Sequence, residues 1–329
     1  MSTMSSAAAT PAPAIARPRA RARRLAEPLI YAVVTAGVLV FLLTTSGFAT
    51  TDNLKAVLLS SSLVGMLAIG QTLIMISGSF FSLSLGTSTA VSAMVFLWGL
   101  QFGVLPAILL AVAFGATVSA VQGLPVGAWA ANPIVMTIGG SVVLTGIVVL
   151  MTGGSTVRPP ADAPSINFLV RPIAGIPVGF YVLVVATLVA EFVLRRGRLG
   201  HTTYLVGESR PAARAAGLPV GACITGIFAV AGACGAIAGI LAGAVQGGAT
   251  FSIEGTLAFD AIAATLVGGC AVAGGRGSVL RTLAGTLGIA AISSALLLRG
   301  YAAGTQILVK GVIVFAVVLF VHLKTRSRA

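Results

Sequence analysis

Charged residues are scarce in this sequence. Of its 329 residues, 8% are charged and 57% are hydrophobic, and the mean hydropathy is +1.06. A soluble domain carries about 25% charged residues, so the composition excludes a soluble enzyme, a disordered chain and a disulfide-rich secreted module. No charged residue occurs from Ala56 to Val157. This stretch is long enough for several membrane-spanning helices of roughly 20 residues each.

Metal-binding and nucleotide-binding motifs are missing as well. The three cysteines and two histidines form no cluster with metal-ligand spacing. Cys223 and Cys234 lie about 16 Å apart along a helix, too far to form a disulfide, and we interpret all three cysteines as small packing residues. No Gly-rich loop is followed by Lys-Ser/Thr, so the chain has no P-loop for ATP. Since the seven acids form no catalytic pair, we expect no metal, no cofactor and no enzymatic activity.

The hydrophobic runs that remain are continuous. A transmembrane barrel would alternate apolar and polar residues, and the 41 glycines suit closely packed helices. The net charge of +13 comes from basic residues clustered in loops, which is typical of membrane topology and not of nucleic-acid binding. The predicted fold class is an all-α polytopic membrane protein.

The positions of the basic clusters predict the number of spans. Residues 1–27 form a basic tail, which we expect to be disordered and cytoplasmic, and the run from about Pro28 to Phe48 is the first predicted span. A second basic cluster, residues 195–198, should also be cytoplasmic, so an even number of spans separates it from the tail. One span lies just before that cluster. The charge-free stretch then holds four spans of about 25 residues, since six would leave about 17 each and no room for turns.

The same reasoning applies to the C-terminal half. Four more spans fit between Gly217 and Leu323, which gives ten spans, a transmembrane domain of residues 28–323 and a cytoplasmic tail of residues 324–329. Most Lys and Arg residues then lie inside, as the positive-inside rule expects. Those outside or near the outer face are Lys55, Arg158, Arg171, Arg299 and Lys310.

The span order predicts an inverted repeat. Span 7 comes five spans after span 2. Because this offset is odd, any repeat between spans 2–5 and 7–10 is inverted. Each half also contains a helix broken by small residues, near residues 76–86 in the first half and 267–277 in the second. Interrupted spans at matching places in two halves indicate a transport site at their interface.

The segment between spans 6 and 7 predicts a short polar helix. Ser209 suits its N-cap, Pro211 its first turn and Gly217 its C-terminal end. Four alanines between residues 212 and 216 give this helix a small, flat surface. It is either a docking element for a cytoplasmic partner or a solvated loop with one helical turn.

Several motifs resemble one family. Residues 207–218 resemble the cytoplasmic Gly-x-Asn-x-x-Ala-Ala-x-x-x-Gly-Ile element of sugar ATP-binding-cassette importer permeases of the ribose type, with Ser209 in place of the Asn. Residues 260–278 are similar to the Asp-Ala-Ile-Ala-Ala…Gly-Gly…Gly-Gly-Arg-Gly-Ser block of that family. The resemblance covers about residues 52–320. It departs at residues 79–84, where Ser-Phe-Phe-Ser-Leu-Ser replaces Gly-Gly-Ile-Asp-Leu-Ser and the acid is lost.

The resemblance implies a transport subunit that works by alternating access. Its implied partners are a cytoplasmic ATPase, a periplasmic solute-binding protein, a second permease copy or paralogue, and the lipid bilayer, but no nucleic acid; the location is the bacterial inner membrane. The docking helix for the ATPase would comprise Glu208, Ser209, Arg210, Pro211, Ala212, Ala213, Arg214 and Gly217. The translocation path would be lined by Gln71, Ser77, Gly78, Ser82, Ser84 and Asn132, unless these side chains only bond their own backbone. The structural glycines would be Gly268, Gly269, Gly274, Gly275 and Gly277.

Three functions remain open at this point. The first is a sugar importer permease, and the second is a related permease for another small polar solute such as a nucleoside or polyol. The third is an ion-coupled carrier working alone. Ion-coupled carriers use ionisable groups inside the membrane, and spans 2–5 contain none, which favours an external ATPase. Asp260 is interpreted as a first-turn acid stabilised by the helix dipole.

Overall fold

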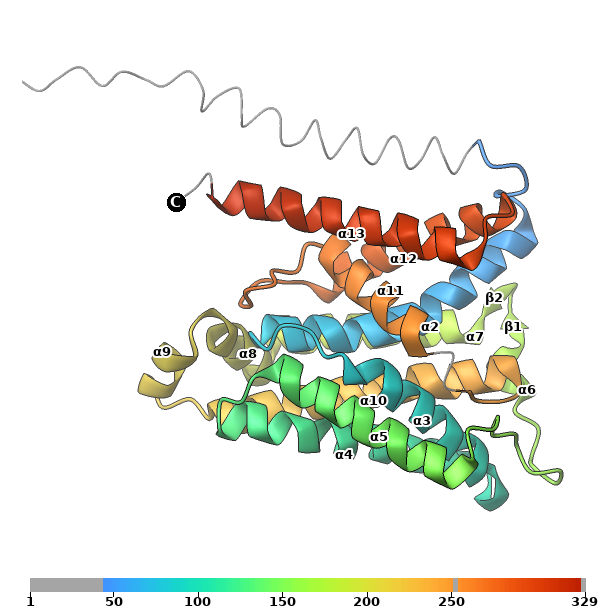
Figure 1. The fold of residues 1–329 in the computed structure, drawn as a ribbon, viewed down its shortest axis with the longest axis horizontal. Coiled ribbons are helices and arrows are strands. Elements are labelled where there is room, and N and C mark those ends of the chain that lie inside the picture. The colour runs from blue at the N-terminus through green and yellow to red at the C-terminus, as the bar shows by residue number, and fades with distance from the viewer. Residues whose placement is uncertain (1–43, 251–253, 327–329) are drawn as a thin grey trace, which may run out of the picture. The chain divides into compact units, whose positions relative to one another are not determined.

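The computed structural model describes residues 44–250 and 254–326, and the element labels follow Figure 1. The predicted basic tail, nearly all of the first predicted span and the last three residues of the chain lie outside these ranges. Residues 44–48, which end that predicted span, form turns. The helices and strands of the first part are α2 (Thr51–Ile76), α3 (Ser84–Gly99), η1 (Leu100–Phe102), α4 (Val104–Ala128), α5 (Pro133–Thr152), α6 (Asn167–Val170), β1 (Pro172–Ile173) and β2 (Ile176–Pro177). Those of the second part are α7 (Val178–Arg196), α8 (Arg198–Glu208), α9 (Arg210–Ala215), α10 (Val220–Gln246), α11 (Glu254–Val267), α12 (Val279–Leu298) and α13 (Ala303–Arg326).

The described part of the chain is almost entirely helical and belongs to a polytopic membrane protein. Seven of its helices are long and apolar enough to cross a bilayer: α2, α3 with η1, α4, α5, α7, α10 and α12. Shorter apolar stretches occur at Thr256–Val267 in α11 and Ala303–Ala316 in α13. The charge-free stretch holds four helices, as predicted, and four more follow α9.

Helix α10 is the centre of the fold. It packs along α4, α3 and α2, while α12 and α11 pack on α2 from the other side (Figure 1). The helices α2 and α3 are mostly buried, whereas α4, α5 and α7 expose most of their apolar side chains. An apolar surface of this kind is what a helix facing lipid presents.

Small residues allow α4 and α10 to touch through their backbones. A methyl group on Gly115 would lie 2.7 Å from the carbonyl oxygen of Gly232. In return, a methyl group on Gly232 would collide with the carbonyl oxygen of Gly115. Interfaces of this kind are common between membrane helices, where dispersion contacts must supply the attraction because lipid is as apolar as the side chains.

The two chain breaks expected from the sequence are present but are not equivalent in the two halves. The first lies between α2 and α3, the first and second helices of its half, while the second lies between α11 and α12, the second and third helices of its half. The predicted matching places were therefore wrong. In the second half, the connection that corresponds in order to residues 77–83 lies between α10 and α11.

Candidate functional site

The short helix α9 is closed at both ends as its sequence predicts. The Oγ of Ser209 accepts a hydrogen bond from the amide of Ala212 at 3.3 Å, and Pro211 occupies the first turn. At the other end Gly217 has φ +74°, and the amide of Leu218 donates to the carbonyl oxygen of Ala213 at 3.0 Å. This is the Schellman pattern, in which a left-handed glycine lets the chain turn back over the last carbonyls.

The alanines of α9 do not form one exposed surface. Ala212, Ala215 and Ala216 are exposed, whereas Ala213 is 4% exposed and packs into the core beside α10. The expectation that all four alanines face a partner is therefore wrong for Ala213. One side of this six-residue helix packs against the rest of the protein, and Ala213 is the small residue on that side.

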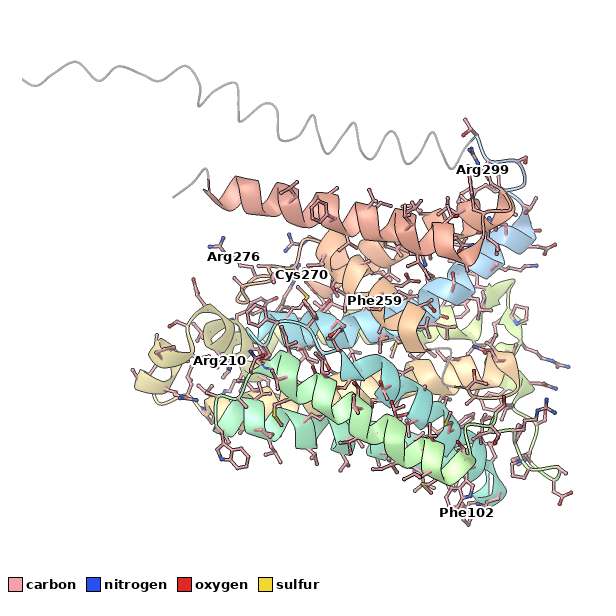
Figure 2. The ribbon with its side chains drawn as sticks, in the orientation of Figure 1. Phe102, Arg210, Phe259, Cys270, Arg276 and Arg299 are labelled. Atoms are coloured by element: carbon pink, nitrogen blue, oxygen red, sulfur yellow. The ribbon has the colours of Figure 1, made fainter. Side chains whose placement is uncertain are left out.

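Arg210 joins α9 to the break between α2 and α3. Its Nη2 donates to the carbonyl oxygen of Gly78 at 3.1 Å and to the Oγ of Ser79 at 2.9 Å. The guanidinium, labelled in Figure 2, is partly buried. Of the predicted docking residues, Arg210 therefore faces inward, while Glu208 and Arg214 are exposed.

Three glycine-containing segments meet beside Arg210. The amide of Gly275 donates to the carbonyl oxygen of Ile76 at 3.0 Å. A methyl group on Gly274 would lie 2.6 Å from the Cα of Gly78 and 2.8 Å from the carbonyl oxygen of Gly207, and one on Gly207 would collide with the carbonyl oxygen of Ile76. Residues 76–78, 207 and 274–275 thus form a junction, which we call the glycine junction, and its glycines have no room for a side chain.

The remaining predicted structural glycines have similar roles. Gly268 and Gly277 are closely surrounded: a methyl group on Gly268 would lie 2.8 Å from the Cα of Thr282, and one on Gly277 would lie 2.7 Å from the Cγ1 of Ile76. Gly269 has φ +78° and follows the last turn of α11. These positions need glycine for space or for backbone conformation.

The predicted path residues of α2 and α3 lie in one buried network. The Oε1 of Gln71 accepts a hydrogen bond from the amide of Ser82 at 3.0 Å, and its Nε2 donates one to the carbonyl oxygen of Ser82 at 2.7 Å. The Oγ of Ser84 bonds the Oγ of Ser82 at 3.1 Å and donates to the Oε1 of Gln122. Gln71, Ser82 and Ser84 are at most 2% exposed. Gln71 thus pairs both backbone groups of Ser82, which lies in a non-helical segment that hydrocarbon could not satisfy.

Ser77 and Asn132 also make local contacts. Ser77 is fully buried and donates to the carbonyl oxygen of Ile74 at 2.7 Å. Asn132 caps α5 by accepting the amide of Ile134 at 3.0 Å. The structure brings Gln71, Ser82 and Ser84 together and leaves Asn132 apart, so their role on a path stays a prediction.

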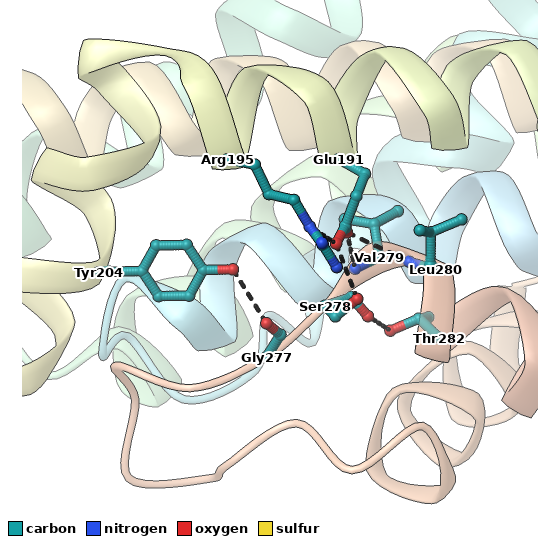
Figure 3. A network of polar contacts seen from close by, with 8 residues as sticks. All are labelled: Glu191, Arg195, Tyr204, Gly277, Ser278, Val279, Leu280 and Thr282. Carbon is teal, nitrogen blue, oxygen red and sulfur yellow. Dashed lines mark hydrogen bonds and ion pairs between the residues drawn. The ribbon is translucent and has the colours of Figure 1, made fainter.

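Sequence reasoning missed Glu191, which caps a helix from another part of the chain (Figure 3). Its side chain, from α7, accepts from the amides of Val279 at 2.7 Å and Leu280 at 3.3 Å, at the start of α12. The Oγ of Ser278 donates to it at 3.0 Å and the Nε of Arg195 at 2.7 Å. A carboxylate at a helix N-terminus receives unpaired amides and meets the positive end of the helix dipole. A single acid in an apolar helix, four residues before an arginine, was the available signal.

Tyr204 bonds the segment between the glycine junction and α12. Its hydroxyl donates to the carbonyl oxygen of Gly277 at 2.9 Å (Figure 3). Burial raises the pKa of the Tyr204 hydroxyl above its usual value, and the nearby charge of Glu191 raises it further. The hydroxyl therefore stays protonated and remains a donor at physiological pH.

Asp260 and Lys310 form an ion pair between α11 and α13. The Nζ of Lys310 lies 2.8 Å from the Oδ2 of Asp260, and each side chain is 14% exposed. Asp260 is the seventh residue of α11, which begins at Glu254. The interpretation of Asp260 as a first-turn acid is therefore wrong, because the helix dipole acts within about one turn of the end.

The described residues hold no group of three or more His, Cys, Asp or Glu side chains placed to bind a metal ion. Cys223 and Cys270 are buried, Cys234 is half-buried, and all three are free thiols. Cys270 is in the loop before α12, and its Sγ lies 3.6 Å from the Oγ1 of Thr282. Nothing in this arrangement points to thiol chemistry.

The sequence is similar to that of known membrane permeases. A family model described as the branched-chain amino acid transport system / permease component matches residues 53–322. The ribose import permease protein RbsC of Escherichia coli (strain K12) is 30% identical over 278 residues, which are 83% of this chain and 86% of the relative.

Two further relatives come from the same strain. The probable ABC transporter permease protein YphD is 32% identical over 299 residues, 90% of either chain. The D-allose transport system permease protein AlsC is 27% identical over 275 residues, 82% of this chain and 83% of the relative. No solved structure matches the chain.

Proposed function

The chain belongs to the branched-chain amino acid transport system / permease component family, and from this premise we propose that it carries a monosaccharide or related sugar across the bacterial inner membrane. It is a transport subunit and does no chemistry on the solute. A separate ATPase supplies the energy, and a periplasmic binding protein delivers the sugar.

One observation carries the proposal. Relatives named for ribose and D-allose transport align with more than four fifths of the chain, and the matched residues include α9, the glycine junction and the segment between α2 and α3. A nucleoside or polyol permease of the same family is the second candidate. The acid of the sugar-branch motif is absent from residues 79–84, and this departure supports the second candidate.

The proposed topology has ten spans and an inverted repeat of α2–α5 with α10–α13. Four helices in each half support it. Both chain ends and α9 then lie in the cytoplasm, where the basic residues concentrate.

The proposed coupling element is α9. Its exposed side contains Ala212, Ala215 and Ala216, which would let the backbone of a partner come close. Its other side is tied to the α2–α3 break through Arg210. A push on α9 by the ATPase would therefore reach residues 77–83, which lead into the buried network around Gln71.

A transport assay in vesicles tests the proposal. Reconstituted permease is given its ATPase and ATP inside and the binding protein with labelled sugar outside, with and without a protonophore. We expect uptake that needs ATP and the binding protein and ignores the protonophore. Uptake by the permease alone, driven by a pH step, would instead establish an ion-coupled carrier.

A further inference from the structure

The Asp260–Lys310 pair lies in the middle of two apolar helices, α11 and α13. Asp260 is seven residues from the end of α11 at Val267, and Lys310 is seven residues from the start of α13 at Ala303. At 1.5 Å per residue, each lies about 10 Å from that end of its helix. The pair is therefore well within helices whose other residues are mostly apolar.

A cavity of about 480 Å³ opens beside this pair. It lies between α11 and α13, and its polar lining consists of Thr256, Asp260 and Lys310. The ring of Phe259, labelled on α11 in Figure 2, contributes to the rest of the lining together with aliphatic side chains such as Ile307. A mostly apolar cavity with a few convergent polar groups is the usual form of a small-molecule site.

The pair has bonding capacity left over. Among the described residues, Asp260 is the one hydrogen-bond partner of Lys310, and only its Oδ2 is engaged. A lysine ammonium has three donors and a carboxylate accepts on both oxygens. Two N–H groups and Oδ1 are therefore available to bond a further polar group.

We propose that this cavity is a solute-contact site on the translocation path and that it takes a neutral polyhydroxylated solute. A hydroxyl group donates to Asp260 and accepts from Lys310, so adjacent hydroxyls match both charges. The pair has no net charge, so an anionic solute would be repelled by Asp260 and a cationic solute by Lys310. The ring of Phe259 offers an apolar face to the C–H side of a sugar ring. The inference rests on the proposed function and places the contact site between α11 and α13.

Uptake measurements on the assembled transporter test the site. Cells expressing the permease with its ATPase and binding protein are given a panel of labelled neutral monosaccharides, including D-ribose and D-allose. We compare the parent with Asp260→Asn and Lys310→Met. The matched control is Asp52→Asn with Lys55→Gln, which removes an exposed ion pair at the start of α2.

Each variant at the site should lower uptake about tenfold or more, the effect of losing one charged hydrogen bond, while the control stays at the parental rate. The ratio of uptake rates between two sugars of the panel should also change, because the contacts to individual hydroxyls differ. A purely structural pair would lower all sugars by the same factor. Binding-protein-stimulated ATP hydrolysis by the purified complex shows that each variant has assembled.

The exchange Asp260→Lys with Lys310→Asp covers the case in which the single variants do not fold. It keeps the ion pair and the net charge, so the complex should assemble with an altered sugar ratio. If every assembled variant keeps the parent's ratio of uptake rates between the sugars, the proposed contact site is wrong, while the proposed function still stands. If the parent takes up no sugar of the panel, the proposed function fails and the site fails with it.

Discussion

The Nη2 of Arg210 lies 3.1 Å from the carbonyl oxygen of Gly78, although 132 positions separate the two residues in the sequence. The same nitrogen reaches the Oγ of Ser79 at 2.9 Å. This contact ties α9 to the break between α2 and α3, so whatever moves α9 also acts on residues 77–83.

The first prediction concerns this tie. Arg210→Ala should leave the carbonyl oxygen of Gly78 without its donor and cost about 1.5–3 kcal/mol of stability. ATP-driven uptake should fall more than the thermal stability of the purified permease explains, because α9 is no longer linked to the α2–α3 break. Arg210→Lys, which keeps a charged donor, should recover part of the uptake. Normal uptake by Arg210→Ala at normal ATPase activity would show that motion is not transmitted here.

The second prediction concerns the exposed side of α9. Ala215→Trp should block close approach of the ATPase and reduce its co-purification with the permease, with little effect on the thermal stability of the permease alone. Ala213→Leu is the comparison, because Ala213 is buried. It should overpack the core and cost about 1–3 kcal/mol of stability. A complex that assembles and transports normally with Trp at position 215 would remove α9 from the docking surface.

The third prediction concerns Glu191. Glu191→Gln replaces one acceptor oxygen with an amide that faces other donors, so it should cost about 1.5–3 kcal/mol, the range for hydrogen bonds to a charged group. Ser278→Ala removes a single donor from the same carboxylate and should cost about 1 kcal/mol. Thermal unfolding of the two purified variants measures the order. Equal stabilities of both variants and the parent would mean that the carboxylate does not hold the start of α12.

The fourth prediction concerns the glycine junction. Gly207→Ala places a methyl group against the carbonyl oxygen of Ile76 and should break the bond from Gly275 to that oxygen. We expect a loss of about 3 kcal/mol or more, or a failure to express, since overpacking here meets backbone. Gly226→Ala in α10 is the matched control, because nothing lies within 4 Å of its added methyl group. It should be neutral or raise stability by up to about 1 kcal/mol. Similar melting temperatures for the two variants would contradict the close approach.

The fifth prediction concerns topology. A reporter fused after residue 329 should be active if it requires the cytoplasm and inactive if it requires the periplasm. The basic residues at the end of the chain and around α8 and α9 are the reason. A periplasmic signal from the C-terminal fusion would mean that the number of spans is odd or that the whole chain has the opposite orientation.

Local features of the structure could be predicted from the sequence, and contacts between distant segments could not. The caps of α9 depend on Ser209, Pro211 and Gly217, which lie within one short segment, and the structure has them. The four helices of the charge-free stretch follow from its length and from bilayer thickness. The glycine junction joins three segments, so its existence depends on packing that no single segment encodes.

Glu191 and Asp260 were missed or misread for the same reason. The role of a carboxylate in a helix depends on its neighbour in space. For Glu191 this neighbour is the start of α12, and for Asp260 it is Lys310 on α13. The serines near residues 77–84 and Gln71 look like path residues in the sequence because they are polar within apolar runs. In the structure Gln71 bonds the backbone of Ser82, and the serine side chains bond a helix carbonyl or one another.

The contact of Gly115 with Gly232 limits how the molecule can change shape. Two helices whose backbones touch resist sliding or rotation against each other, so we expect α4 and α10 to move together. Helix α13, by contrast, packs mainly on α11 and α12. Any rearrangement that opens one side and closes the other would then use α4 and α10 as a fixed frame, and the Asp260–Lys310 cavity lies at a boundary free to shift against it.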